Sequence, residues 1–270
     1  MTGVQEYGRM RVMKKVVFIG GGSGLQDIIP VFLQMKCELT AIVSVFDSGG
    51  STGQLRQKLN IPAVGDLRRV YSAASQPAMA ELMEYRESIH PVGNLALAFF
   101  IQKYGFAKGL QKYAELTQAK ATVVPISFDV ADVIAVLENG QELLGEHQLD
   151  APPKKYAKQK VTELKLNKKV QLNPAVKKAL RAADVMVTGP GSLLGSLLPN
   201  FLVPDFATSF EKSKATKIFV APGRPEFGYR GEDALEMAER LPVSFDEILE
   251  NPGKRWEAKQ LAAEIKKLIK

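Results

Sequence analysis

A short apolar strand that runs straight into a cluster of glycines constrains the fold of this 270-residue chain more than any other feature. Residues 15–19 (KVVFI) are mostly β-branched, and residues 20–24 (GGGSG) follow at once. Apolar residues then recur at helical spacing over 25–36, and a second apolar run covers 39–45. Strand, helix and strand within about thirty residues form a βαβ unit, in which the two strands are parallel. The sequence therefore predicts an α/β fold with a Rossmann-like, mainly parallel sheet and helices on both faces.

Pro30 lies inside the first predicted helix, and a proline in a helix interior costs ~3 kcal/mol. The conflict disappears if Asp27 is the N-cap, because Pro30 then falls in the first turn, where no amide partner is lost. We therefore expect this helix to begin at Asp27.

The same patterning predicts elements along the rest of the chain. Helices are expected over 77–86, 94–104, 174–182 and 256–270, and strands over 122–126, 132–137, 161–166, 184–188 and 217–221. A hairpin signal, Asn139-Gly140, precedes residues 142–149, and Asn173 followed by Pro174 is an N-cap with an N1 proline. Because no Pro/Gly/Ser-rich linker divides the chain, we predict one domain over 13–270 with a β-rich insertion near 121–172. Residues 1–12 show no clear hydrophobic periodicity. We expect them to be a disordered N-terminal lead, or to lie upstream of a translation start at Met13.

Composition excludes several classes of protein. A single cysteine, Cys37, excludes an internal disulfide framework, and with only two histidines, His90 and His147, a zinc site of Cys and His ligands is not expected. The longest apolar run, Leu95 to Ile101, is far shorter than the ~18 residues of a membrane span. The N-terminus carries no apolar signal core, so we expect a cytoplasmic protein.

The net charge of +7 comes from one stretch of the chain. Residues 154–181 hold ten basic side chains and one acid, a net of +9, which leaves −2 for the rest. We expect a solvated face there, with docking of an acidic protein partner as the alternative. No helix-turn-helix or aromatic-stacking motif favours a nucleic-acid partner.

The first glycine turn is a candidate phosphate site. Glycines let the backbone approach a phosphate closely, and the start of the next helix offers free amides and partial positive charge. The spacing is not G-x-G-x-x-G, because Leu25 stands where the third glycine belongs. A tight turn without a ligand remains the alternative. The candidate residues are Gly20, Gly21, Gly22, Ser23 and Gly24.

A second candidate loop, FDSGGSTGQLR, follows the second predicted strand. Asp47 lies about twenty residues beyond the glycine turn, where a nicotinamide enzyme places an acid on the ribose hydroxyls. That interpretation leaves Ser51, Thr52 and Arg56 unexplained, and these residues together favour an anion-binding loop. An ordinary surface loop is the alternative.

Three further segments carry polar candidates. Asp66 could bind a metal ion or a sugar hydroxyl, and Arg68 could bind a phosphate. The alternative is that Asp66 is a helix N-cap and Arg68 a surface arginine. His90 fits the role of a structural loop residue as well as that of a ligand-binding residue. Asn94 is by default expected to cap a helix, and the alternative is that it binds the edge of a base or a sugar. A second glycine turn, GPGS, follows the strand 184–188, and ligands of open α/β sheets bind at this edge. Its candidates are Gly189, Gly191, Ser192 and Asn200.

The ordered motifs GGGSGL, TAIVSVFDSGGSTGQLR, GDLR, GNLALA and GPGSLLGSLLPNFLV resemble one family over about residues 14–220. This is the group of the 2-phospho-L-lactate transferase (CofD) and the bacterial gluconeogenesis factor (YvcK), and the likeness is greater to the second branch. The resemblance implies a nucleotide at the carboxyl edge of a Rossmann-like sheet. It implies either a regulator of carbon or cell-envelope metabolism that binds UDP-sugars, or a magnesium-dependent transferase that moves a phospholactyl group from a guanosine diphosphate donor to a deazaflavin precursor. A homodimer is a further expectation of the family.

Matched to the family motifs, the candidates take expected roles. Asp47 and Asp66 become catalytic and magnesium-binding if the protein is a transferase, and the other candidates surround the nucleotide. This sequence departs from the family pattern at three places. Ser48 replaces the second acid of DDGG, which removes one metal ligand; Arg69 replaces an asparagine; and Leu194-Gly195 replaces Tyr-Thr, so that no tyrosine stacks there.

Overall fold

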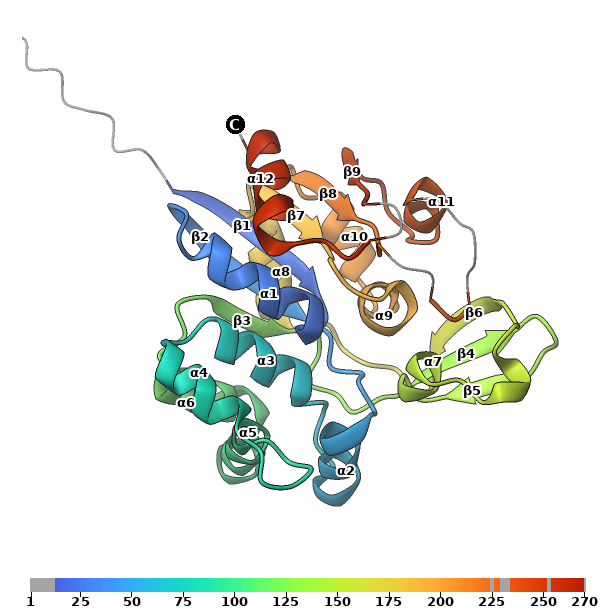
Figure 1. Cartoon of the computed structure of the whole chain (residues 1–270), viewed down its shortest axis with the longest axis horizontal. Coiled ribbons are helices and arrows are strands. Elements are labelled where there is room, and N and C mark those ends of the chain that lie inside the picture. The colour runs from blue at the N-terminus through green and yellow to red at the C-terminus, as the bar shows by residue number, and fades with distance from the viewer. Residues whose placement is uncertain (1–12, 224–225, 229–233, 252–253, 270) are drawn as a thin grey trace, which may run out of the picture.

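The computed structural model describes residues 13–223, 226–228, 234–251 and 254–269, so the disordered lead predicted for residues 1–12 lies outside the described residues. Its centre is a six-stranded sheet of order β3-β2-β1-β7-β8-β9, in which every neighbouring pair is parallel (Figure 1). The strands are β1 (Lys14–Gly20), β2 (Cys37–Val43), β3 (Thr122–Pro125), β7 (Val185–Thr188), β8 (Thr216–Val220) and β9 (Glu247–Leu249). The predicted α/β class with a parallel sheet is confirmed.

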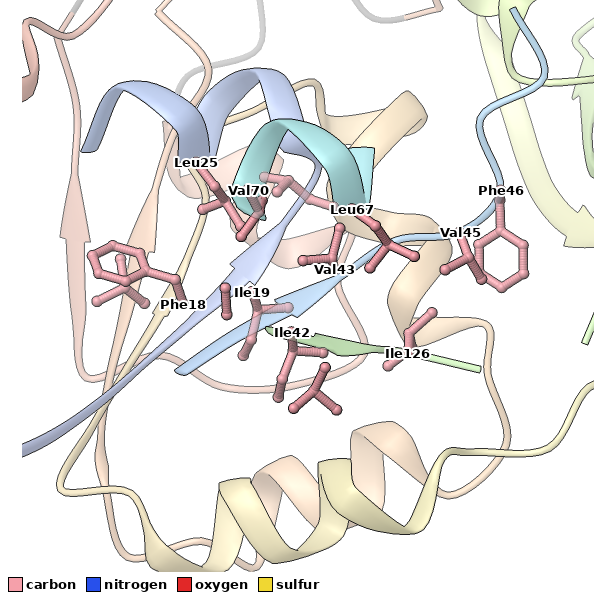
Figure 2. Packing of buried hydrophobic residues seen from close by; sticks show 14 of the residues in the cluster. Phe18, Ile19, Leu25, Ile42, Val43, Val45, Phe46, Leu67, Val70 and Ile126 are labelled. Atoms are coloured by element: carbon pink, nitrogen blue, oxygen red, sulfur yellow. The ribbon is translucent and has the colours of Figure 1, made fainter. Parts of the chain in front are cut away.

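Helices cover both faces of this sheet. Figure 2 shows α1 (Gly22–Phe32) and α3 (Gly65–Ala73) over one face, where Leu25, Leu67 and Val70 point at the strands. The inner strands are buried on both faces, as the successive residues Ile42 and Val43 of β2 show, since their side chains point to opposite faces and both are at 0% exposure. The other helices are α2 (Gly50–Leu59), α4 (Pro77–Glu84), α5 (Val92–Tyr104), α6 (Phe106–Thr117), α7 (His147–Asp150), α8 (Pro174–Ala182), α9 (Leu198–Phe201), α10 (Phe206–Glu211), α11 (Ala234–Glu239) and α12 (Ala258–Leu268). Two further helical turns are η1 (Lys154–Tyr156) and η2 (Leu193–Leu197).

The start expected for the first helix is wrong. The glycine turn itself forms the first turn of α1, whose N-cap is Gly21 in an extended conformation. Asp27 is therefore an exposed residue within the helix, and Pro30 lies near its C-terminal end. The proline is tolerated because its ring faces solvent and the helix ends two residues later, so little regular structure follows the missing amide.

The small sheet is antiparallel and has the order β5-β4-β6, formed by β4 (Val133–Leu137), β5 (Glu142–Leu144) and β6 (Val161–Leu166). The predicted hairpin joins β4 and β5, with Gly140 at φ +80°. The expected insertion boundary at 121 is wrong, because β3 pairs with β2 in the main sheet. The segment 142–149 also divides, since β5 ends at Leu144 and α7 begins at His147. Figure 1 shows the small sheet beside the parallel sheet.

The C-terminal helix α12 packs on α1, and it buries Leu261 and Ile265, as its amphipathic pattern predicts. The predicted cap of α8 is also present, since Asn173 Oδ1 accepts a hydrogen bond of 3.0 Å from the Ala175 amide. Among the described residues, no helix combines the length and apolar character needed to cross a membrane.

Candidate functional site

The polar candidates gather where the parallel strands end. Because β1, β2 and β7 run in one direction, the loops that follow them meet at the same edge of the sheet. The chain passes from β1 to β2 on one side, and β7 and β8 lie on the other side of β1. This is a topological switch point, where open α/β sheets leave a crevice for a ligand.

A polar cavity of about 370 Å³ opens at this edge. The first turns of four helices line it: Ser23 and Gly24 from α1, Gly50, Ser51 and Thr52 from α2, Gly65 and Asp66 from α3, and Asn94 from α5. Amides in the first turn of a helix have no intrahelical acceptor, and the macrodipole places partial positive charge there. The convergence of four helix starts makes one side of this polar cavity a favourable environment for an anion.

Three arginines add formal positive charge to the lining: Arg68, Arg69 and Arg86. Arg68 is 1% exposed, and burial lowers the pKa of its guanidinium while its ion pair with Glu84 opposes that shift. Arg69 donates a hydrogen bond of 2.9 Å to Asp66 Oδ1. Arg69, whose side chain is 30% exposed, and Arg86, which is exposed and donates to the Ile89 carbonyl, both have side-chain surface to offer a ligand.

Four carboxyl groups line the same cavity: Asp47, Asp66, Glu146 and Asp150. Burial, the charges of Asp150, Asp47 and Asp66, and a hydrogen bond to Asp47 together raise the pKa of Glu146 to about 9. Burial and the charge of Asp47 raise the pKa of Asp66 to about 6, although Arg69 and the Gly22 amide oppose the shift. Burial and Asp47 also raise the pKa of Asp150. Glu146 is therefore protonated at neutral pH and can donate a hydrogen bond.

Asn94 joins two of the helix starts. Its Nδ2 donates a hydrogen bond of 2.9 Å to Ser51 Oγ, and its Oδ1 accepts one of 3.2 Å from Arg68 Nε. Ser51 Oγ and His90 Nδ1 share a further hydrogen bond of 2.9 Å. The expected cap role of Asn94 is wrong, because α5 begins at Val92 with Pro91 as N-cap. Asn94 instead fixes the positions of Ser51 and Arg68 in the lining.

Glycines at the first turn make room for other parts of the protein. A Cβ on Gly24 would lie 1.9 Å from the Pro190 carbonyl oxygen, and one on Gly22 would lie 2.5 Å from Asp66 Cα. A Cβ on Gly21 would lie 2.6 Å from Ser196 Oγ. Gly20, Gly21 and Gly22 are outside the lining, while Ser23 and Gly24 belong to it. The first turn of α1 therefore packs against neighbouring parts of the protein, which include the loop after β7. Only Ser23 and Gly24, at the end of that turn, face the polar cavity.

The second glycine turn already holds a carboxylate of the protein. Glu226 Oε2 accepts hydrogen bonds of 2.8 Å from Ser192 Oγ and 3.1 Å from the Leu193 amide. Ser192 Oγ in turn accepts one of 3.0 Å from the Gly195 amide, as an N-cap does. Glu226 thus occupies the position of an external anion at the start of η2. Gly191 and Ser192 line the polar cavity, whereas Gly189 and Asn200 do not.

Gly189, Asn200 and Arg56 have structural roles. Gly189 has φ +101°, and a Cβ there would lie 2.7 Å from the Val220 carbonyl oxygen. Asn200 Nδ2 donates a hydrogen bond of 2.8 Å to the Ser196 carbonyl. Arg56 was expected beside a diphosphate, but it lies outside the lining, because its guanidinium donates to the carbonyls of Asp47 and Ala131 and pairs with Asp132 at 2.9 Å.

The sequence did not point to Glu146, Asp150, Arg86 or Ser196 as site residues. Glu146 and Asp150 come from the end of the hairpin and from α7, so only the tertiary fold carries them to the sheet edge. Glu146 carried a weak signal, because it is a polar residue within the segment 142–149 that follows the predicted hairpin turn. Leu194, which replaces the family tyrosine, is 1% exposed and outside the polar cavity.

Magnesium would find oxygen ligands here. Within the described part of the chain, no group of three His, Cys, Asp or Glu side chains has the geometry to hold a metal ion. Asp47 and Asp66 nevertheless line the same cavity, with Asp47 beside Gly65 and Asp66 beside Gly22. Mg²⁺ often takes one or two carboxylates together with substrate phosphates and water, so this pair fits the donor set of a magnesium–phosphate site.

Comparison with known proteins agrees with this architecture. The family described as "2-phospho-L-lactate transferase CofD" matches residues 16–245. A protein of Thermotoga maritima named "Putative gluconeogenesis factor" is 36% identical over 255 residues, which is 89% of this chain and 79% of the relative. A "Gluconeogenesis factor" of Halalkalibacterium halodurans is 35% identical, over 77% of this chain and 66% of the relative.

A crystal structure from Bacillus halodurans, described as a member of the UPF0052 family, superposes with a TM-score of 0.82 at 31% identity. The superposition covers 94% of this chain and 85% of that one. The fold, the motif order and the sequence similarity all lead to one assignment: the chain belongs to the CofD family, among relatives named gluconeogenesis factor.

Proposed function

We propose that the protein binds a nucleotide or nucleotide-sugar in the polar cavity and acts in the cytoplasm as a regulator of carbon or cell-envelope metabolism. One observation carries this proposal: the first turns of α1, α2, α3 and α5 line a single cavity at the switch point of the sheet. Helix starts gathered around one cavity suit a diphosphate group better than any neutral ligand.

The helix starts and the carboxyl groups of the polar cavity suit two different parts of such a ligand. A diphosphate would lie beside Ser23, Gly24 and the start of α2, within reach of Arg69. Sugar hydroxyls are donors as well as acceptors, and carboxylates such as Asp47 and Asp150 accept their hydrogen bonds. Protonated Glu146 supplies a donor among these acceptors. The names of the gluconeogenesis-factor relatives support a role in carbon metabolism.

The carboxyl groups of the polar cavity favour a second candidate, a transferase of the phospholactyl type. The acceptor hydroxyl would form a new P–O bond to the phosphorus that bears the lactyl group, and the bond from that phosphorus to the bridging oxygen would break, releasing GMP. A carboxylate, either Asp47 or Asp66, would take the hydroxyl proton. These two residues would also hold Mg²⁺, which neutralises diphosphate charge when bound. The family description supports this candidate.

Binding is tested by mass spectrometry of any nucleotide that co-purifies, followed by thermal unfolding with UDP, GDP and UDP-glucose. A ligand at one hundred times its Kd adds ~2.7 kcal/mol to the free energy of unfolding, which is a measurable rise in Tm. We expect such a rise with at least one of these nucleotides. No bound nucleotide and no rise with any of them would contradict the proposal. The transferase is tested separately by incubation with donor, acceptor and Mg²⁺, in which absence of GMP would exclude it.

Two predictions from the sequence concern partners. The ten basic side chains of 154–181 are absent from the lining of the polar cavity, and Lys154, Lys155, Lys158 and Lys160 are all exposed. Docking of an acidic partner on this stretch is compatible with that exposure. Formation of a homodimer likewise stays a prediction, for which the molecular mass in solution is the measurement.

A further inference from the structure

A second cavity, of about 250 Å³, adjoins the polar cavity on the side of β8. We call it the apolar cavity, because its walls include Ile28, Ala221, Pro222, Trp256, Ala258 and Leu261. These residues come from α1, from the loop after β8, and from α12 with the segment before it. The proposed binding of a nucleotide in the polar cavity makes no use of this space.

The two cavities share their rim. Ser23 and Gly24 at the start of α1, and Gly191 and Ser192 of the second glycine turn, line both of them. The polar cavity continues from this rim toward the carboxylates and the starts of α2, α3 and α5. A ligand whose charged group lies at the rim therefore has a polar space on one side and an apolar space on the other.

Trp256 makes the apolar cavity suitable for a planar ring. It is the chain's single tryptophan, and its indole forms part of the wall. Its Nε1 is buried without a hydrogen-bond partner among the described residues, so the described contacts hold the ring by packing alone. Stacking on an aromatic face does not depend on which base is present, since every base has a π-face.

A charged pair stands beside this ring. Arg255, the neighbour of Trp256, forms an ion pair with Asp27 of α1, and both side chains line the apolar cavity. Both are largely exposed, so the pair adds little stability. A guanidinium and a carboxylate together present donors and an acceptor, which is what the polar edge of a base requires.

We infer that the apolar cavity receives the base of the nucleotide, stacked against Trp256, while the phosphates cross the shared rim at Ser23 and Gly24 and the remaining part enters the polar cavity. The other part of the rim, at Ser192, already holds the carboxylate of Glu226. This inference rests on the proposed function, and it assigns each part of the ligand to a space. Ligand pockets measure about 300–1,000 Å³, so the apolar cavity, at about 250 Å³, holds only part of such a ligand. A nucleotide needs both spaces.

The single tryptophan makes the inference directly measurable. Intrinsic fluorescence is followed during titration with UDP, GDP and pyrophosphate, and calorimetry gives the affinities. We expect the nucleotides to change the fluorescence of Trp256, whereas pyrophosphate, which has no base, binds without that change. Trp256→Ala is expected to weaken nucleotide binding about 5- to 150-fold, the range found for stacked bases, and to leave pyrophosphate affinity unchanged. Trp256→Phe, measured by calorimetry, should recover most of the loss.

A second variant guards against a loss of folding. Ala258 is half-exposed and lines the apolar cavity, so Ala258→Phe fills that space from a surface position. It should weaken nucleotide binding and spare pyrophosphate binding, which also reports an intact fold. Nucleotide binding that changes neither with Trp256→Ala nor with Ala258→Phe overturns the inference and leaves the proposed function standing. Absence of nucleotide binding to the wild-type protein overturns both.

Discussion

Asn94 Nδ2 donates a hydrogen bond of 2.9 Å to Ser51 Oγ, and this contact ties the first turn of α5 to the first turn of α2 across 43 positions of sequence. The same side chain accepts from buried Arg68 through Oδ1. One amide therefore satisfies two polar groups of the lining. Because both contacts are buried, the arrangement of the polar cavity depends on this residue.

Asn94→Ala should lower the free energy of unfolding by ~1–3 kcal/mol, because it removes two buried hydrogen bonds and takes away the acceptor of Arg68 Nε. Urea unfolding at pH 7 measures the change. Leu95→Ala is the matched control on the same helix, since Leu95 is 47% exposed and a surface substitution costs within about 0.5 kcal/mol. Equal effects of the two variants would show that Asn94 contributes no more than a surface residue.

Gly24→Ala should destabilise the protein by ~1–3 kcal/mol or more, because its Cβ would lie 1.9 Å from the Pro190 carbonyl oxygen and backbone must move. Gly191→Ala is the control from the facing turn, where the nearest atoms are side-chain atoms at 3.4 Å. Thermal unfolding of both proteins compares them. If Gly24→Ala unfolds at the wild-type Tm, the close approach of the two glycine turns is not a requirement of the fold.

Glu146 predicts a pH dependence of stability. Its pKa is about 9 in the folded protein, whereas its ordinary value is 4.5. Between pH 4.5 and about pH 9 the folded state therefore keeps the carboxyl proton that the unfolded state has lost. The unfolded state then holds fewer protons, and the free energy of unfolding falls as pH rises from about 4.5 to about 9. Glu146→Gln keeps a donor near Asp47 and carries no charge, so its stability should fall less over this window. Urea unfolding at pH 5, 7 and 9 distinguishes the curves, and parallel curves would contradict the assignment.

Arg69 predicts where the anion binds. Arg69→Gln should weaken the binding of a nucleoside diphosphate about tenfold or more, the loss expected for one charge-assisted hydrogen bond. The double variant Lys154→Gln/Lys155→Gln removes two exposed charges from outside the polar cavity and should leave the affinity unchanged at 0.15 M salt. The opposite pattern would place the anion on the basic stretch.

The parallel sheet was predictable because its inner strands are buried on both faces and read as apolar runs, and two of them, β1 and β7, lead into glycines. The position of the site followed from the same fact, since parallel strands bring their following loops to one edge. Helix starts were less predictable. In α1 the glycines themselves form the first turn, and in α5 Val92 starts the helix two residues before the expected Asn94.

Tertiary contacts decided the roles that the sequence left open. Arg56 was a reasonable phosphate ligand by motif, yet backbone carbonyls and Asp132 occupy its guanidinium. Glu146 and Asp150 reach the polar cavity only because the small sheet and α7 lie against the sheet edge. The contact between Glu226 and Ser192 likewise joins residues that lie 34 positions apart in the sequence. Local patterns carry no information on such contacts.

Calorimetric titration of the wild-type protein and Arg69→Gln with UDP-glucose and GDP tests the central claim most directly. The account predicts saturable binding of one nucleotide per chain, competition by pyrophosphate, and an affinity about tenfold or more weaker in Arg69→Gln. Absence of heat with both nucleotides, or binding that pyrophosphate does not displace and Arg69→Gln does not weaken, would contradict a diphosphate site at the convergence of the four helix starts.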